Sequence, residues 1–290
     1  MPLRDIATLE AEIALAEAQV PHLRAGCEKR VIWAGDAAAR TDHAVVFIHG
    51  FSASPEEIRP LPDLVAKGLG ANLHFTRLTG HGQDGAAMGS ATLAAWQADV
   101  AEALDITQTI GKRVVVIGCS TGCTLATLAL SQGARIDAIV HVSPNFGLAN
   151  RIGQSLLDLP FSRKWAHVAA GAERSFPKLS DAHAAYWTLR YPTQAIHPMA
   201  DAVRAVHSAA VERVTTPALF CFNEADKVVS ADRTRKIIAR WGGPVETYLF
   251  QQTAADDPMG HIMAGDIFSP GQTAPAVGRI LAWLRAVDAC

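Results

Sequence analysis

The sequence contains no run of about 18 uncharged apolar residues, the length that a helix needs to cross a bilayer. Residues 1–26 also lack the uncharged core of a signal peptide, because Asp5, Glu10, Glu12 and Glu17 interrupt their most apolar stretch. Both absences argue against a spanning or exported protein. We therefore expect a cytoplasmic chain with no membrane span.

The chain also has no excess of positive charge. Its 26 Lys and Arg residues stand against 28 Asp and Glu residues, the formal net charge is −2, and the charged residues are scattered singly. A nucleic-acid-binding surface needs a basic stripe that neutralises a row of phosphates. We therefore expect no nucleic-acid partner.

Cysteine is scarce and does not form a paired framework. The five cysteines are odd in number and unevenly spaced, which indicates free thiols in a reducing compartment; they are Cys27, Cys119, Cys123, Cys221 and Cys290. Cys119 and Cys123 lack a second close pair that would complete a tetrahedral metal site. We expect neither disulfides nor a metal ion.

What the sequence does contain is typical of a globular protein: 49% apolar and 19% charged residues in a chain of 290. It shows no internal repeat and no low-complexity linker, so a single domain over residues 1–290 is favoured. Short apolar or β-branched runs predict buried strands at 30–33, 44–49, 71–78, 113–118, 137–143, 218–223 and 245–251. Helical patterns occupy 6–20, 58–69, 92–110, 121–133, 231–241 and 275–287. This alternation predicts a mostly parallel sheet covered on both faces, a three-layer α/β sandwich.

One connection is too long for a single crossover helix. Residues 147–214 separate two predicted strands and are rich in helix formers, which predicts a helical cap inserted before the strand at 218–223. This segment also holds many aromatic and histidine residues: Phe161, Trp165, His167, Phe176, His183, Tyr186, Trp187, Tyr191 and His197. They could line an apolar pocket, form the core of the cap, or make the surface of a homodimer, and the sequence does not choose among these.

The segment Gly118-Cys119-Ser120-Thr121-Gly122 fits the pattern G-x-S-x-G and lies between a β-branched strand and a helical run. A serine on a sharp strand-to-helix turn presents its hydroxyl above the sheet, and the flanking glycines let the two elements pack closely. A serine that merely lies between glycines in a surface turn does not predict a strand before it or a helix after it. The context therefore predicts that Ser120 is a nucleophile.

A serine hydroxyl needs a base that removes its proton, and histidine has a suitable pKa. His261 lies in an irregular segment between the last strand and the C-terminal helix, where a loop can carry the ring over the nucleophile. By contrast, His22, His43, His74 and His141 lie in or before predicted elements and are expected to be packed or surface residues.

The imidazole needs a carboxylate that holds one tautomer. Asp226 follows the strand at 218–223 and is the predicted acid. Its rivals are Glu224, which is nearer the strand, and Asp256 and Asp257, which we expect to be solvated loop residues.

Acyl transfer also needs two donors aimed at the oxyanion, usually backbone N–H groups. One is expected from Thr121, directly after the nucleophile. The other is expected from Phe51, in the turn His49-Gly50-Phe51 that follows a strand.

These motifs, in the order nucleophile, acid and base, resemble the α/β-hydrolase superfamily over residue 31 to the C-terminus. Leu78-Thr79-Gly80-His81-Gly82 is similar to the L-x-G-H-G segment of bacterial carboxylesterases and monoacylglycerol lipases, in which this histidine is structural. The resemblance implies cleavage of carboxylic esters with a short to medium acyl chain, including monoacylglycerol-like lipids, without a cofactor. Cys119 departs from the usual residue before the nucleophile; it could fill space or sense oxidation.

The same groups also serve thioesterases and acyltransferases, so these alternatives stay open. Ser120 argues against a haloalkane dehalogenase, which needs a carboxylate nucleophile. A binding protein with a hydrolase fold and no turnover is a further alternative, although such proteins usually lack a member of the triad.

Overall fold

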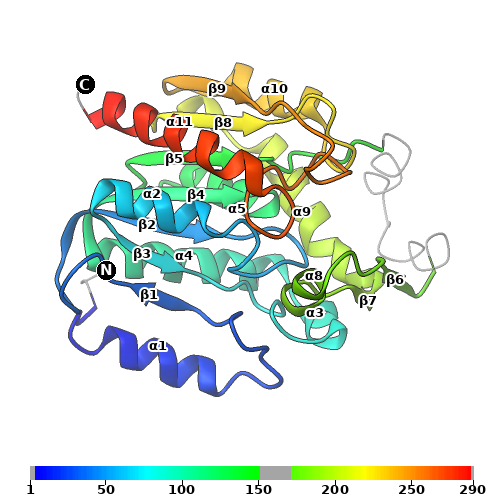
Figure 1. The fold of residues 1–290 in the computed structure, drawn as a ribbon, viewed down its shortest axis with the longest axis horizontal. Coiled ribbons are helices and arrows are strands. Elements are labelled where there is room, and N and C mark those ends of the chain that lie inside the picture. The colour runs from blue at the N-terminus through cyan, green and yellow to red at the C-terminus, as the bar shows by residue number, and fades with distance from the viewer. Residues whose placement is uncertain (1–3, 151–170, 289–290) are drawn as a thin grey trace.

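The computed structural model describes residues 4–150 and 171–288. A seven-stranded sheet crosses the molecule in the order β1-β3-β2-β4-β5-β8-β9, and every neighbouring pair is parallel except β1 with β3 (Figure 1). The strands are β1 (Arg30–Ile32), β2 (Thr41–Ile48), β3 (Asn72–Phe75), β4 (Gly111–Cys119), β5 (Ala138–Val142), β8 (Ala218–Phe222) and β9 (Val245–Leu249). The predicted mostly parallel sheet is confirmed.

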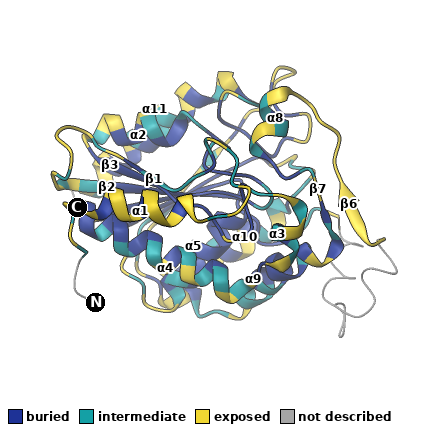
Figure 2. Cartoon of the chain, turned by 90° about the horizontal axis from the view of Figure 1, so that it is seen from below, coloured by how far each residue is buried: buried dark blue, intermediate teal, exposed yellow. Residues whose placement is uncertain are grey.

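Helices cover both faces of this sheet. One face packs against α4 (Leu93–Ile110), α5 (Thr121–Ser131), α9 (Ile196–Ser208) and α10 (Ala231–Arg240). The other face packs against α2 (Leu61–Leu69) and α11 (Pro270–Asp288), and Figure 2 shows the dark blue strands between the two helical layers. The three-layer α/β prediction is therefore confirmed.

Burial of the strands follows their place in the sheet. All residues of β5 and β8 are buried, and β2 and β4 have buried runs toward their C-terminal ends, as near-continuous apolar strands require. The sequence also predicts a buried strand at 245–251, but this is wrong for β9, whose five residues are exposed or half-buried. β9 is an edge strand, and its polar Glu246 and Thr247 suit one that faces water.

The N-terminal helix α1 (Leu9–Ala18) lies beside β1 and packs on it through Leu9 and Ile13, which share a small core cluster with Val31 and Ile106. Its last turn is fixed by Glu17, which receives two hydrogen bonds from Arg77 at 2.7 and 2.8 Å. Both partners are almost fully buried. The ion pair therefore ties α1 to the loop after β3.

The described part of the insertion between β5 and β8 is not only helical. It contains a short antiparallel ribbon of β6 (Glu173–Ser175) and β7 (Arg190–Pro192), helix α8 (Asp181–Tyr186), and 3₁₀ turns η1 (Thr193–Ala195) and η2 (Val211–Arg213). Helix α9 also falls in the expected cap range, but its Met199 and Val206 join the core cluster on one face of the sheet. Phe161, Trp165 and His167 of the expected cap lie outside the described residues.

A further small helix, α3 (Gly85–Ser90), meets this insertion through Met88, which packs with Tyr191 of β7.

In the described ranges, no helix is long and apolar enough to cross a membrane. The four described cysteines are buried free thiols, and no group of three or more His, Cys, Asp or Glu residues in this part could hold a metal ion.

His141 on β5 is buried, with its ring stacked on Phe220 at a centroid distance of 4.4 Å. Neither ring nitrogen has a hydrogen-bond partner in the described structure, and burial lowers its pKa to about 3. Because the unfolded chain binds this proton near pH 6.5 and the folded chain does not, stability is lost as the pH falls below about 6.5. Burial acts in the same direction on His74 and His81, whose pKa values fall to about 4.

We expect the substitution His141→Phe to remove the part of this pH-dependent loss of stability that is due to His141. Between pH 8 and pH 5 the wild type should lose about 2 kcal/mol more unfolding free energy than the variant, because about 1.5 pH units separate pH 5 from the unfolded pKa. Urea unfolding at both pH values measures this, and pH 8 is the internal reference because His141 is neutral there in both states. An identical loss in the two proteins would contradict the assignment.

Candidate active site

Ser120 occupies the sharp turn between β4 and α5, where its backbone adopts φ 49°. The two flanking glycines are required by close packing. A Cβ atom at Gly122 would lie 2.0 Å from the Ile48 carbonyl oxygen, and one at Gly118 would lie 2.9 Å from the Cys123 nitrogen. The turn is held by Ser120 itself, whose N–H donates to the Val142 carbonyl at 3.0 Å. The sequence pattern therefore reflects a real steric constraint.

The structure brings the three predicted polar side chains together. The Ser120 hydroxyl lies 3.1 Å from His261 Nε2, and His261 Nδ1 lies 2.8 Å from Asp226 Oδ2. These residues come from different places: the β4–α5 turn, the loop between β9 and α11, and the loop after β8. In this geometry Nδ1–H donates to the carboxylate, and Nε2 is left to accept the serine proton.

Asp226 is fixed on its other side. Its Oδ1 accepts hydrogen bonds from the backbone N–H groups of Val228 at 2.7 Å and Val229 at 2.9 Å, and the side chain is only 2% exposed. The rival Glu224 is instead partly exposed and ion-paired with Arg235. The geometry thus places Asp226, and not Glu224, against His261.

The expectation that Asp256 and Asp257 are solvated is wrong, because both are buried. Asp257 Oδ2 accepts hydrogen bonds from the backbone N–H groups of His261 at 3.0 Å and Ile262 at 2.9 Å. Asp256 Oδ2 accepts from Thr253 N–H at 2.7 Å. A tight loop leaves N–H groups that secondary structure does not satisfy, and these two carboxylates satisfy several of them. Asp257 therefore holds the backbone that carries His261, a role that no sequence pattern indicated.

Burial lowers the pKa of His261, but the Asp226 carboxylate, together with Glu57 and Asp257, outweighs it and leaves that pKa raised. A raised pKa means that the site stabilises the imidazolium that forms when the ring takes a proton. This is the electrostatic setting that a general base beside a serine needs.

The turn His49-Gly50-Phe51 lies against Ser120. A Cβ atom at Gly50 would lie only 3.0 Å from Ser120 Cβ, so only glycine lets the chain come this close. The ring of His49 locks the turn, since it accepts a hydrogen bond from Leu78 N–H and hydrogen-bonds the Gly50 carbonyl. Across the described part of the chain, no protein acceptor is found for the N–H of Phe51 or Thr121. Both predicted donors are thus available to a ligand.

Phe51, the last residue of the turn His49-Gly50-Phe51, belongs to a cluster of aromatic rings. The Phe51 ring contacts His81, Trp96 and Tyr191 at centroid distances of 6.1, 6.3 and 5.3 Å. His81 is fully buried, and burial lowers its pKa to about 4, which suits a packed neutral ring. Tyr191 brings the insertion into contact with the turn. These rings give the neighbourhood of Phe51 an apolar character.

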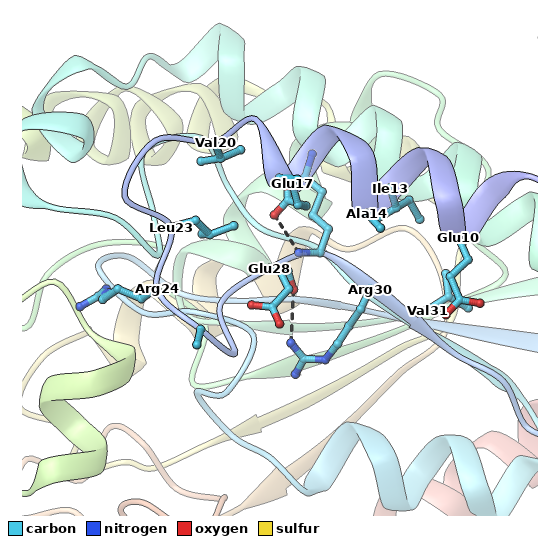
Figure 3. Close-up of a pocket in the computed structure, with 13 residues that line it drawn as sticks. Glu10, Ile13, Ala14, Glu17, Val20, Leu23, Arg24, Glu28, Arg30 and Val31 are labelled. Atoms are coloured by element: carbon cyan, nitrogen blue, oxygen red, sulfur yellow. Dashed lines mark hydrogen bonds between the residues drawn. The ribbon is translucent and has the colours of Figure 1, made fainter.

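A cavity of about 490 Å³ lies elsewhere, between α1 and the segment that leads into β1 (Figure 3). Glu17, Arg24 and Arg30 are among its lining residues, whereas Ser120, Asp226 and His261 are not. The chemistry of the serine site therefore does not take place in this cavity.

Known proteins resemble this chain in sequence and in fold. A family model described as the alpha/beta hydrolase family matches residues 45–276. No curated protein matches the sequence. Among solved structures, a metagenome-derived lipolytic enzyme described in work on LipS and LipT superposes with a TM-score of 0.72 at 21% identity, covering 91% of this chain and 99% of that one.

Two lipases are also similar in fold. The monoacylglycerol lipase of Paleococcus ferrophilus has a TM-score of 0.64 at 14% identity, over 89% of this chain and 98% of its own. A soluble variant of the monoglyceride lipase of Saccharomyces cerevisiae has a TM-score of 0.66 at 12% identity, over 90% and 91%. At such identities the likeness shows the fold alone.

Proposed function

Because the chain belongs to the alpha/beta hydrolase family, we propose that it is a serine hydrolase that cleaves carboxylic esters through an acyl-enzyme on Ser120. The observation that carries this proposal is the unbroken hydrogen-bonded series Asp226–His261–Ser120, beside two backbone N–H groups that have no acceptor among the described residues. A nucleophile, a base and an orienting carboxylate in this order are what acyl transfer requires.

The proposed reaction has two halves. Ser120 Oγ attacks the ester carbonyl while His261 Nε2 takes its proton, and the N–H groups of Phe51 and Thr121 hold the oxyanion. The imidazolium then gives its proton to the departing alcohol, which leaves the acyl group on Ser120. Water then attacks the acyl carbonyl while His261 Nε2 takes one of its protons. Collapse of the second oxyanion breaks the bond between the acyl carbon and Ser120 Oγ, and Oγ takes the proton back from His261 as the acid leaves. Asp226 keeps the imidazole in one tautomer throughout.

The proposed substrates are esters with a short to medium acyl chain, including monoacylglycerol-like lipids. The apolar rings around Phe51 support an apolar group near the oxyanion turn. The neighbours named as lipolytic enzymes and monoacylglycerol lipases are consistent with this class. We further propose that residues 1–290 form one domain and that the insertion at 147–214 caps the site, because Tyr191 of β7 contacts Phe51.

The proposal is tested with wild-type protein and two assays. We expect hydrolysis of p-nitrophenyl acetate and butyrate, slower hydrolysis of the decanoate, and covalent labelling by a fluorophosphonate that maps to the peptide carrying Ser120. A matched acyl thioester should react more slowly than the ester. Thioester turnover without ester turnover would replace the proposal by a thioesterase, and absence of both turnover and labelling would favour a binding protein.

A further inference from the structure

The carboxylate of Glu57 is buried directly behind the oxyanion turn. Glu57 is 2% exposed, and its Oε2 accepts a hydrogen bond from the Gly50 N–H at 2.6 Å. Its neighbour Glu56, by contrast, is ion-paired with Arg30 and Arg59. Over the residues that the structure describes, no lysine or arginine pairs with Glu57. Burial of a carboxylate without a cation is costly, so its place beside the turn needs an explanation.

Gly50 is enclosed between Glu57 and the nucleophile. A Cβ atom there would lie 2.6 Å from Glu57 Oε1 and 3.0 Å from Ser120 Cβ. Glycine has more backbone freedom than any other residue, so a turn built on it needs outside contacts to fix its direction. The hydrogen bond to Glu57 fixes the Gly50 N–H. The next N–H along the chain is that of Phe51, the proposed oxyanion donor, and its direction depends on the same turn.

Two other titratable groups face Glu57, the Cys119 thiol from β4 and the His261 imidazole from the β9–α11 loop. Burial raises the pKa of Glu57 to about 7, against the opposing effects of the Gly50 N–H, His261 and Cys119. Glu57 in turn raises the pKa of His261, alongside Asp226 and Asp257. The charge of each group therefore affects the pKa of the other.

The ionised form of Glu57 is the one that its surroundings fit. The Gly50 N–H is a donor, and the ionised carboxylate is the stronger acceptor for it, because a charge-assisted hydrogen bond is roughly twice as strong as a neutral one. A protonated Glu57 would accept the Gly50 N–H only through a neutral carbonyl oxygen, which is a weaker acceptor than a carboxylate. Protonation should therefore loosen the contact that fixes the turn.

Accepting the proposed hydrolase function, we propose that Glu57 is a positioning residue. Its ionised carboxylate holds the Gly50 turn so that the Phe51 N–H faces the oxyanion, and its charge helps His261 to hold the proton taken from Ser120. Reaction at Ser120 is then fastest when two groups, His261 and Glu57, are deprotonated.

The rate of Ser120 labelling by a fluorophosphonate between pH 5 and pH 9 tests this without knowledge of the substrate. For the wild type we expect the logarithm of the rate to rise below pH 7 with a slope above one. In Glu57→Gln the slope should fall to one and its midpoint should move to lower pH, because His261 loses a negative neighbour. At pH 8 this variant should react about 3- to 10-fold more slowly than the wild type, because its neutral amide oxygen, like the oxygen of a protonated carboxyl group, accepts the Gly50 N–H less strongly than a carboxylate does.

Glu57→Ala removes the acceptor, and we expect labelling at pH 8 to be about 10- to 100-fold slower. Glu56→Gln is the matched control and should keep both the wild-type rate and the wild-type slope. Thermal melting establishes that each variant is folded; if Glu57→Ala is not, the pH profile of Glu57→Gln decides alone. A wild-type slope and midpoint that Glu57→Gln leaves unchanged would overturn the role of Glu57 only. A wild type that is not labelled at any pH would overturn the proposed function, and this role with it.

Discussion

Replacement of Ser120 by alanine is expected to lower kcat/KM for p-nitrophenyl butyrate by at least about 10³-fold. Without Oγ, no acyl-enzyme can form, and only the oxyanion donors and substrate binding remain to assist attack by water. The fold should be little affected, because Oγ makes one side-chain hydrogen bond, to His261, while the turn is held by backbone contacts of Ser120. Steady-state hydrolysis of the variant beside the wild type measures the loss, and thermal melting measures the stability.

Ser131→Ala is the matched control for this variant. Ser131 lies at the opposite end of the same helix, α5, and its hydroxyl donates a hydrogen bond to the Leu128 carbonyl. Its activity should equal that of the wild type. If Ser120→Ala were as active as Ser131→Ala, Ser120 would not be the nucleophile and the proposed acyl-enzyme would be wrong.

Much of the fold could be predicted because the central strands carry their signal locally. β4 and β5 are covered on both faces, so their sequences are near-continuous apolar runs that need no knowledge of the partner strand. The sequence of an edge strand lacks such a continuous apolar run, so its burial is harder to predict. The residues of β9 are mostly accessible, and only the strand order shows why.

The same distinction applies to the candidate site. Ser120, Asp226 and His261 could be picked out because each follows a strand, and parallel strands bring their carboxyl ends to one edge of the sheet. The roles of Glu57 and Asp257 could not, because a charged residue in a loop is expected to be solvated. Their burial depends on contacts with Gly50 and with the His261 backbone, which a sequence window does not contain.

Replacement of Asp226 by asparagine should lower kcat by about 10⁴-fold with little change in KM. Oδ1 of Asp226 already accepts two backbone N–H groups, from Val228 and Val229, so the single oxygen of asparagine will stay on that side. The amide NH₂ must then face His261 Nδ1, which becomes an acceptor, and the ring proton moves to Nε2. A protonated Nε2 opposite Ser120 Oγ cannot take the serine proton.

The alternative orientation of the amide in Asp226→Asn is disfavoured by the same contacts. It would place the NH₂ group against two backbone donors and leave both partly buried N–H groups unsatisfied, at up to about 1–3 kcal/mol each. Measurement of kcat and KM for p-nitrophenyl butyrate from pH 6 to pH 9 tests the argument, with Glu224→Gln as the control because that carboxylate pairs with Arg235 outside the site. Since the defect is a misplaced proton and not a lost binding contact, the loss must appear in kcat; an Asp226→Asn variant within tenfold of wild-type kcat would show that His261 does not depend on this carboxylate for its tautomer.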